Sequence, residues 1–116
     1  MSIKIIKTKI KKSELLEMAG EDFGDVVKAA IDVKQEIMAV GGELHADEEV
    51  LLSERENSKR EDTWGINLYP KKSDEEFIKF DSLINIKPNF NNRSRGVENA
   101  GIREKIKKIV KNLVGG

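Results

Sequence analysis

The chain has 116 residues, a length typical of one domain with a single packed core and too short for two independent ones. Charged residues make up 36% of it and hydrophobic residues 38%, acidic and basic side chains are equal in number, and disorder of the whole chain is therefore not expected. The absence of cysteine excludes disulfides, thiol catalysis and cysteine-ligated metal centres, and it suits a reducing compartment. We expect one compact domain over residues 1–116.

The N-terminal segment predicts a strand followed by a helix. Over residues 3–10, IKIIKTKI, apolar and lysine side chains alternate, which is typical of a short strand near a sheet edge that lysines protect from further pairing. Ser13 then offers an N-cap for a helix that should end by Gly20. The apolar face of this helix would consist of Leu15, Leu16, Met18 and Ala19.

Residues 26–40 fit two structures. With a period of two, Val27, Ala29 and Ile31 share one face of a strand, and a turn near residues 34–36 leads to a second strand. With a period of 3.6, the same segment fits one long helix. The density of β-branched residues and the Gly41-Gly42 break favour the hairpin.

The middle of the chain predicts further strands. Glu43, His45 and Asp47 alternate with two small apolar residues, so a strand would place the three polar side chains on one face. Residues 49–54 are largely apolar, and residues 55–62, RENSKRED, indicate a loop or a hairpin tip. Residues 63–70, TWGINLYP, alternate again and end at a proline.

The C-terminal third predicts one strand, one loop and one helix. Residues 77–88, FIKFDSLINIKP, indicate the clearest strand, with Asn85 and Lys87 among its outward side chains. A polar loop follows over residues 88–98. Asn99 can cap a final helix, stopped by Gly115-Gly116, whose apolar positions fall at helical spacing: Ile102, Ile106, Ile109, Val110 and Leu113.

This order of elements predicts an α+β fold. Several short strands in meander order would form a single antiparallel sheet, with an N-terminal and a C-terminal helix packed on one face. No apolar run reaches the length of about 18 residues that spans a membrane, and the N-terminus lacks the apolar block of a secretory signal. We expect a soluble cytoplasmic protein.

The only histidine lies within the densest acidic run of the chain. On a strand, Glu43, His45 and Asp47 could converge on a divalent cation, although a third or fourth ligand at a defined spacing is missing. His45 could also act as a general acid or base with Asp47 or Glu48. The simpler interpretation is a surface hydrogen-bond partner or a structural ion pair, and no cofactor is predicted.

The segment Asn91-Asn92-Arg93-Ser94-Arg95-Gly96 is a candidate for anion recognition. Two arginine side chains and exposed backbone N–H groups suit a phosphate or a carboxylate. The alternative is that Arg93 and Arg95 reach back to the acidic middle of the chain and fix the loop.

Charge is distributed unevenly along the chain. Residues 1–12 carry five lysines and no acid, residues 13–57 carry three basic and thirteen acidic groups, and residues 58–116 carry thirteen basic and eight acidic groups. One interpretation is that the acidic and basic blocks neutralise one another after folding. The other is that the basic blocks form a face for an anionic partner such as RNA. The aromatic residues available for base stacking are few.

Four runs give the chain a resemblance to a known family: GGELHADEE at 41–49, WGINLYP at 64–70, INIKP at 84–88 and NRSRGVEN at 92–99. In these runs it resembles a family of small prokaryotic proteins classed as a domain of unknown function, the one numbered 5674. The resemblance covers nearly the full length and implies a compact domain. It implies no activity, cofactor or catalytic residue.

Two functions are compatible with these features. The first is a small binding or accessory domain that contacts an anionic ligand or partner through a polar cleft between residues 43–47 and 91–96. Its ligand-binding residues would be Glu43, His45, Asn92, Arg93 and Arg95. The alternative is metal-assisted or acid–base phosphodiester hydrolysis by His45 with Glu43 or Asp47, and with Arg93 or Arg95. The order of elements loosely resembles that of small ribonuclease toxins.

Overall fold

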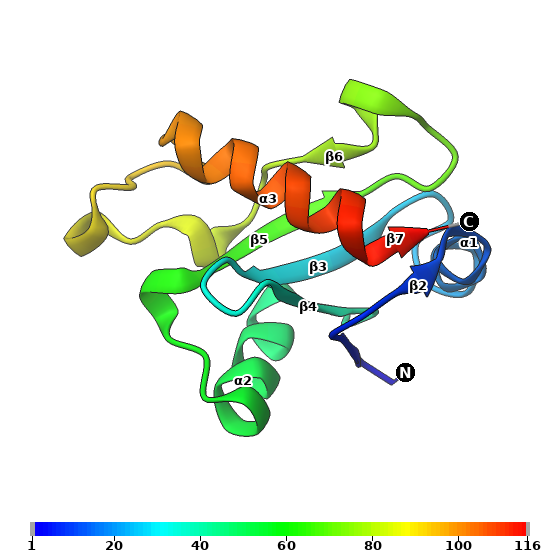
Figure 1. Cartoon of the computed structure of the whole chain (residues 1–116), viewed down its shortest axis with the longest axis horizontal. Helices are drawn as coiled ribbons and strands as arrows, with labels where there is room; N and C mark the ends of the chain where they lie inside the picture. Colours follow the sequence, from blue (N-terminus) through cyan, green and yellow to red (C-terminus); the bar gives the residue numbers. More distant parts are fainter. Residues whose placement is uncertain (1, 116) are drawn as a thin grey trace.

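The computed structural model describes residues 2–115 and contains a five-stranded antiparallel sheet with the strand order β1-β4-β3-β5-β6 (Figure 1). The strands are β1 (Lys4–Ile6), β3 (Val27–Asp32), β4 (Ile37–Val40), β5 (Thr63–Leu68) and β6 (Ile78–Lys79). A separate parallel pair joins β2 (Ile10–Lys11) to β7 (Val114–Gly115). The helices are α1 (Lys12–Glu21), α2 (His45–Glu56) and α3 (Ala100–Leu113). The predicted α+β class is confirmed.

The hairpin predicted for residues 26–40 is confirmed, and the single long helix is wrong. Strand β3 pairs with β4 in antiparallel register, and with β5 on its other side. The turn between β3 and β4 is held by the Asp32 carboxylate, whose Oδ1 accepts the backbone N–H groups of Lys34 at 2.9 Å and Gln35 at 3.0 Å. A short acceptor side chain at this point stabilises a tight turn locally.

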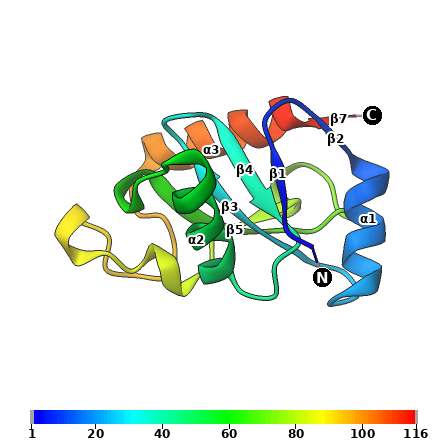
Figure 2. The same cartoon turned by 90° about the horizontal axis from the view of Figure 1, so that it is seen from below.

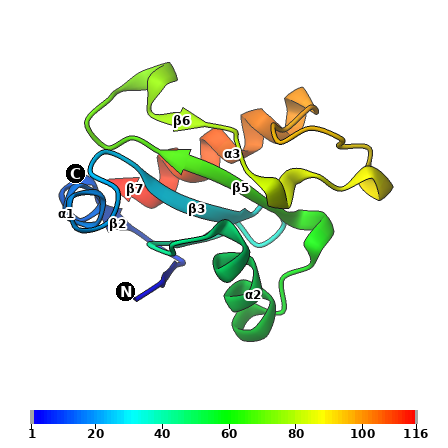
Figure 3. The same cartoon turned by 180° about the vertical axis from the view of Figure 1, so that it is seen from behind.

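Each face of the sheet has its own core. Alternate strand residues such as Ile31 and Ile66 pack with Leu15 of α1 and Ile106 of α3. On the opposite face, Ala30 and its neighbours pack with Leu52 of α2. Helix α3 lies in front of the sheet in Figure 1 and behind it in Figure 3. The prediction that the first and last helices share a face is confirmed, whereas α2 on the other face was not predicted.

The first helix and the segment before it differ in detail from the prediction. The extended stretch 3–10 is divided, because β1 pairs with β4 and β2 belongs to the second sheet beside α1 and the chain's C-terminal end (Figure 2). Helix α1 already begins at Lys12, so Ser13 lies inside it and is not its N-cap. Leu15 and Ala19 are buried as expected, but Leu16 is 38% exposed.

Residues 45–56 form a helix, and the strand predicted around Glu43, His45 and Asp47 is wrong. The alternation extended over only five residues, whereas the buried side chains Glu48 and Leu52 are separated by one helical turn. Asn57, with φ 56°, ends the helix in the left-handed conformation, and a short 3₁₀ turn, Arg60–Asp62, leads into β5. The segment RENSKRED is thus a helix end and a connection, not a hairpin tip.

The strand predicted over residues 77–88 is mostly wrong. Only Ile78–Lys79 pairs with β5, after which the chain forms 3₁₀ turns at Leu83–Asn85 and Pro88–Phe90. Asn85 and Lys87, predicted to point outward, are 0% and 3% exposed. The alternating pattern failed because buried hydrogen bonds, described below, satisfy these polar side chains.

The last helix follows the prediction closely. Asn99 is its N-cap, and the side-chain Oδ1 accepts the N–H of Ile102 at 3.0 Å. Its buried side chains are Ile106, Ile109, Val110 and Leu113. The helix ends at Leu113, where β7 begins, and Gly116 of the predicted stop lies outside the described residues. No helix among residues 2–115 is long and apolar enough to cross a membrane.

Candidate functional site

Gly42 and Glu48 form a buried pair at the start of α2. Glu48 Oε2 accepts the Gly42 N–H at 2.9 Å, and a Cβ at position 42 would lie 2.8 Å from Glu48 Cγ, so the close approach requires glycine. Glu48 Oε1 has no hydrogen-bond partner among residues 2–115. Burial raises the pKa of the Glu48 carboxyl well above its ordinary value, against the effect of the Gly42 bond. The carboxyl group is therefore stabilised in its neutral form.

His45 is directed at the sheet and not at solvent. Its Nε2 lies 2.8 Å from the carbonyl oxygen of Ile66, so Nε2 carries the proton and donates it. Burial lowers the pKa of His45, and this effect outweighs the Ile66 hydrogen bond, which raises it. The ring is neutral at pH 7, and Nδ1 is its remaining acceptor.

The predicted metal ligands do not assemble. His45 is partly buried at the first turn of α2, whereas Glu43 and Asp47 are exposed on either side of it in the chain. In the part of the chain that the structure describes, no group of three or more His, Cys, Asp and Glu side chains could hold a metal ion. The helix removes the shared face that the strand hypothesis required.

Asp81 connects the surroundings of His45 with the predicted arginine loop. Asn67 donates from Nδ2 to the Asp81 carbonyl oxygen at 3.1 Å, and Arg95 Nε donates to Asp81 Oδ1 at 2.6 Å. Burial dominates the pKa of His45 and lowers it, while Asn67 and the charge of Asp81 act in the opposite direction. Asp81 therefore pairs with Arg95 and also influences His45 through its charge.

Two backbone donors of the arginine loop, those of Arg93 and Ser94, are already occupied. Glu98 Oε2 accepts the N–H groups of Arg93 and Ser94, both at 2.8 Å, and these two bonds lower the pKa of Glu98. The chain's own carboxylate thus sits where the sequence suggested a phosphate or carboxylate ligand. Arg95 pairs with Asp81, outside the acidic middle of the chain, and Arg93 is exposed without an ion pair among residues 2–115.

Asn92 is a structural residue of this loop. It is 2% exposed, and its Nδ2 donates to the carbonyl oxygens of Asn85, Ser94 and Gly96 at 2.8, 3.2 and 2.8 Å. Its Oδ1 accepts the Glu98 N–H at 2.8 Å. Because every polar atom of this amide faces the loop's own backbone, Asn92 is not available to the ligand predicted for it.

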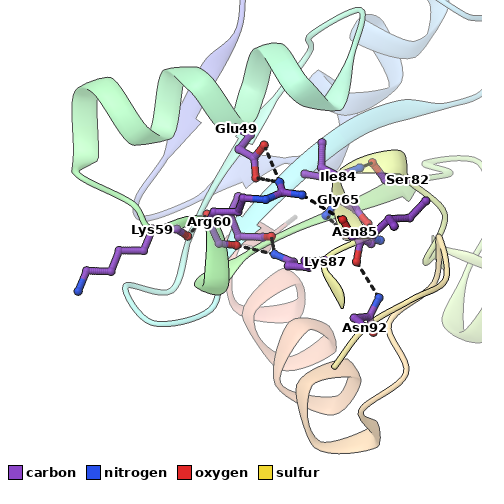
Figure 4. A network of polar contacts seen from close by, with 11 residues as sticks. Glu49, Lys59, Arg60, Gly65, Ser82, Ile84, Asn85, Lys87 and Asn92 are labelled. Atoms are coloured by element: carbon purple, nitrogen blue, oxygen red, sulfur yellow. Dashed lines mark hydrogen bonds and ion pairs between the residues drawn. The ribbon is translucent and has the colours of Figure 1, made fainter. Parts of the chain in front are cut away.

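Asn85 extends the sheet with its side chain (Figure 4). Its Oδ1 accepts the Gly65 N–H at 2.8 Å, and its Nδ2 donates to the carbonyl oxygens of Gly65 at 2.9 Å and Arg95 at 2.8 Å. The amide thereby satisfies both backbone groups of Gly65, as a neighbouring strand would do. A Cβ at position 65 would lie 2.5 Å from Ser82 Oγ, so glycine permits this packing.

Lys87 completes a set that we name the polar clasp: Asn85, Lys87 and Asn92. The Lys87 ammonium group donates to the carbonyl oxygen of Arg60 (Figure 4). It also donates to the carbonyl oxygen of Thr63 and lies 4.0 Å from the centroid of the Trp64 ring. Burial lowers its pKa to about 8, against the nearby charge of Glu49. No feature of the sequence separates this lysine from the exposed ones, and sequence reasoning missed it.

The parallel pairing of β2 with β7 brings the two basic ends of the chain together (Figure 1). Beside this pair lies a groove of about 440 Å³, with lysines and apolar side chains in its lining. We name the surrounding surface the basic face, and its lysines are Lys9, Lys11, Lys12, Lys105, Lys107, Lys108 and Lys111. The charge blocks of the sequence pointed to this face, but their meeting depends on the strand pairing.

Comparisons with known proteins identify the family. No curated protein and no solved structure matches the chain. Residues 4–113 match the family described as "Protein of unknown function (DUF5674)", which covers nearly the whole chain and agrees with the resemblance seen in the sequence. The chain belongs to the DUF5674 family.

Proposed function

We propose that this protein is a single-domain binding module that contacts an acidic protein partner through its basic face. The proposal keeps the anionic partner predicted from the sequence and moves the contact away from residues 43–47 and 91–96. It places the protein in the cytoplasm, a reducing compartment that a chain without cysteine suits.

The observation that carries the proposal is the pairing of Ile10–Lys11 with Val114–Gly115. It joins a lysine-rich N-terminal segment to a helix whose outer side carries lysines at positions 105, 107, 108 and 111 and a single acid, Glu104. A concentration of one charge sign on one surface attracts oppositely charged partners and accelerates their association.

Ion pairs within the chain leave much of this face unneutralised. Lys107 pairs with Glu104 at 3.3 Å and lies 3.8 Å from Glu75. Among residues 2–115, five other lysines of the face form no ion pair and are exposed: Lys9, Lys11, Lys105, Lys108 and Lys111. Basic residues elsewhere do pair with acids, as Lys7 does with Glu56 at 2.8 Å.

The aromatic residues favour a protein partner over a nucleic acid. Single-stranded nucleic acids bind where bases can stack on exposed rings beside positive charges. Trp64 is 2% exposed, and Phe90, which is 46% exposed, lies in the Pro88–Phe90 turn at the opposite end of the molecule from β7 (Figure 1). The aromatic side chain that lines the basic face is Phe77, which is half buried beside Lys12, so this face offers charge with little exposed ring surface for base stacking.

The alternative of phosphodiester hydrolysis has less support. One ring nitrogen of His45 is engaged by a backbone carbonyl, and Arg95, one of the two arginines predicted to assist it, is paired with Asp81. General acid–base catalysis needs a titrating group in contact with the substrate, and positioned donors for the developing charge. His45 offers only Nδ1 for this purpose.

Binding to fluorescent oligoglutamate, measured as a function of salt, tests the proposal. We expect an affinity that falls as salt rises, and a several-fold loss when Lys108→Gln and Lys111→Gln are combined. The matched control combines Arg93→Gln with Arg95→Gln, which removes two charges from the loop predicted by the sequence. A larger loss in this control would move the site to the loop, and tighter binding of an RNA of equal charge would reject the acidic protein partner.

A further inference from the structure

The groove of the basic face has an apolar floor beneath charged edges. The floor consists of Phe77, Ile78, Val110 and Val114, which come from the segment before β6, from β6, from α3 and from β7. A volume of about 440 Å³ lies within the range of ligand-binding clefts. Three of the four floor residues are only half buried, so this apolar surface is open to a partner.

Three lysines line the groove, and they come from two helices. Lys107 and Lys111 are one helical turn apart on α3, about 6 Å along the helix axis. Lys12 lines the same groove from the start of α1, with its Nζ 5.1 Å from the centroid of the Phe77 ring and 3.5 Å from the Lys72 carbonyl oxygen. Lys107 and Lys111 thus present two positive charges one helical turn apart, and Lys12 adds a third from α1.

Two acids, Asp74 and Glu75, line the groove together with three lysines, and Glu75 is weakly held. Glu75 lies 3.8 Å from Lys107, and its side chain is 89% exposed. An exposed ion pair of this length contributes little and is easily exchanged for another carboxylate. Glu75 therefore occupies, at low cost, a position that a partner's carboxylate can take.

We propose that the groove binds an extended peptide segment of the partner in which carboxylates alternate with apolar side chains. This inference rests on the proposed function and specifies the partner's chemistry. In an extended chain, side chains two residues apart are about 6.6 Å apart on the same side, which matches the spacing of Lys107 and Lys111. The alternate side chains then point to the apolar floor.

Three capped hexapeptides separate charge from apolar contact: Ac-ELELEL-amide, Ac-EAEAEA-amide and Ac-QLQLQL-amide. We expect the first to bind at least tenfold more tightly than either of the others, because it alone satisfies the lysines and covers the floor. Amide and methyl NMR shifts on its addition should centre on Phe77, Ile78, Val110 and Val114.

Two matched valine variants test the floor. Val114→Thr keeps the size of the side chain and makes the floor polar, and it should weaken Ac-ELELEL-amide several-fold without changing Ac-EAEAEA-amide. Val33→Thr changes a half-buried valine outside the groove and should leave both affinities unchanged. Because the readout is a ratio of two affinities in one folded variant, a general loss of stability does not imitate it.

The possible outcomes distinguish the groove from the wider proposal. Equal affinities for Ac-ELELEL-amide and Ac-EAEAEA-amide would overturn the groove inference and leave the acidic partner in place. Equal affinities for Ac-QLQLQL-amide and Ac-ELELEL-amide would overturn both the groove inference and the proposed acidic partner, since charge would then not contribute to binding. Shifts centred on residues 91–96 would also overturn the groove inference.

Discussion

The polar clasp and the basic face use the same kinds of side chain for opposite purposes. In the clasp, Asn85, Lys87 and Asn92 are almost completely buried, and each donates to backbone carbonyl groups. On the basic face, Lys108 and Lys111 are exposed and have no acidic partner among residues 2–115. Buried polar groups must be satisfied inside the protein, whereas exposed charges remain available to other molecules.

This difference explains why the distinctive runs of the sequence are poor indicators of a binding site. The runs at 84–88 and 92–99 contain the clasp, and the run at 41–49 contains the Gly42–Glu48 bond. Their unusual residues serve to hold irregular backbone in place. The surface that we propose for binding has an ordinary lysine-rich sequence.

The largest effect is expected from Asn85→Ala. The change leaves the N–H and C=O of Gly65 and the carbonyl oxygen of Arg95 without partners in the interior. We expect a loss of about 3 kcal/mol in the free energy of unfolding, measured by urea denaturation. Asn89→Ala, at an exposed position of the same segment, is the control, and equal midpoints for the two variants would show that the clasp is not structural.

A smaller loss is expected from Gly65→Ala. The added methyl group would lie 2.5 Å from Ser82 Oγ and 2.6 Å from Ser82 Cβ, so the backbone around Ser82 must shift. Overpacking of this kind costs about 1–3 kcal/mol. Gly20→Ala in α1 meets no atom within 4 Å and should instead stabilise the protein by about 0.5–1 kcal/mol in the same urea titration. A tolerated alanine at position 65 would mean that the contact with Ser82 is loose.

The buried ammonium of Lys87 predicts a pH dependence above pH 8. Its pKa is lowered by burial to about 8 in the folded state, while the unfolded value is the ordinary one of about 10.5. Between these values the unfolded state binds more protons at Lys87 than the folded state does. The free energy of unfolding therefore increases as pH rises from about 8 to about 10.5. Lys87→Met should lack this increase in urea midpoints. If the urea midpoints of the wild type and Lys87→Met changed with pH in parallel, the predicted role of Lys87 would be contradicted.

The neutral carboxyl of Glu48 predicts the opposite slope at lower pH. Its pKa is raised by burial, so the folded state binds more protons above the unfolded pKa, and stability decreases as pH rises through that window. Glu48→Gln keeps an oxygen for the Gly42 N–H and cannot ionise. We expect it to match the wild type near pH 4 and to have the higher urea midpoint at pH 8. A lower urea midpoint for Glu48→Gln than for the wild type at pH 8 would contradict this prediction.

The smallest effect on stability is expected on the basic face. Lys108→Gln combined with Lys111→Gln should change the free energy of unfolding by less than about 0.5 kcal/mol, because neither side chain is buried or paired within residues 2–115. The same variant is expected to lose affinity for oligoglutamate. A marked loss of stability would place these lysines with the clasp as structural residues.

Some elements were predictable because their signals are local and repeated. The β3–β4 hairpin combines β-branched strands with a short polar turn, and α3 combines an Asn99 cap with apolar residues over nearly four turns. Strand β5 alternates through Trp64 and Ile66 as expected. In each case one element supplies its own periodicity.

The predicted site was less accessible to sequence reasoning. Asp81 pairs with Arg95 and influences His45, whereas Glu43 and Asp47 are exposed and Asn92 is buried in the loop. A five-residue alternation does not distinguish a strand from the first turn of a helix. The helix was decided by the burial of its inner side chains against the sheet.

Local patterns in the sequence were sufficient to predict the α+β class, the hairpin, the last helix and the presence of two basic blocks. The inward direction of Asn85 and Lys87 could not be predicted in this way, because their partners at Gly65 and Arg60 lie 20 or more residues away in the chain. Only the tertiary structure decided that the basic blocks share a face, because β2 and β7 pair from opposite ends of the chain. Local patterns report a residue's preference for water, whereas the hydrogen bonds that make burial favourable exist only after distant segments meet.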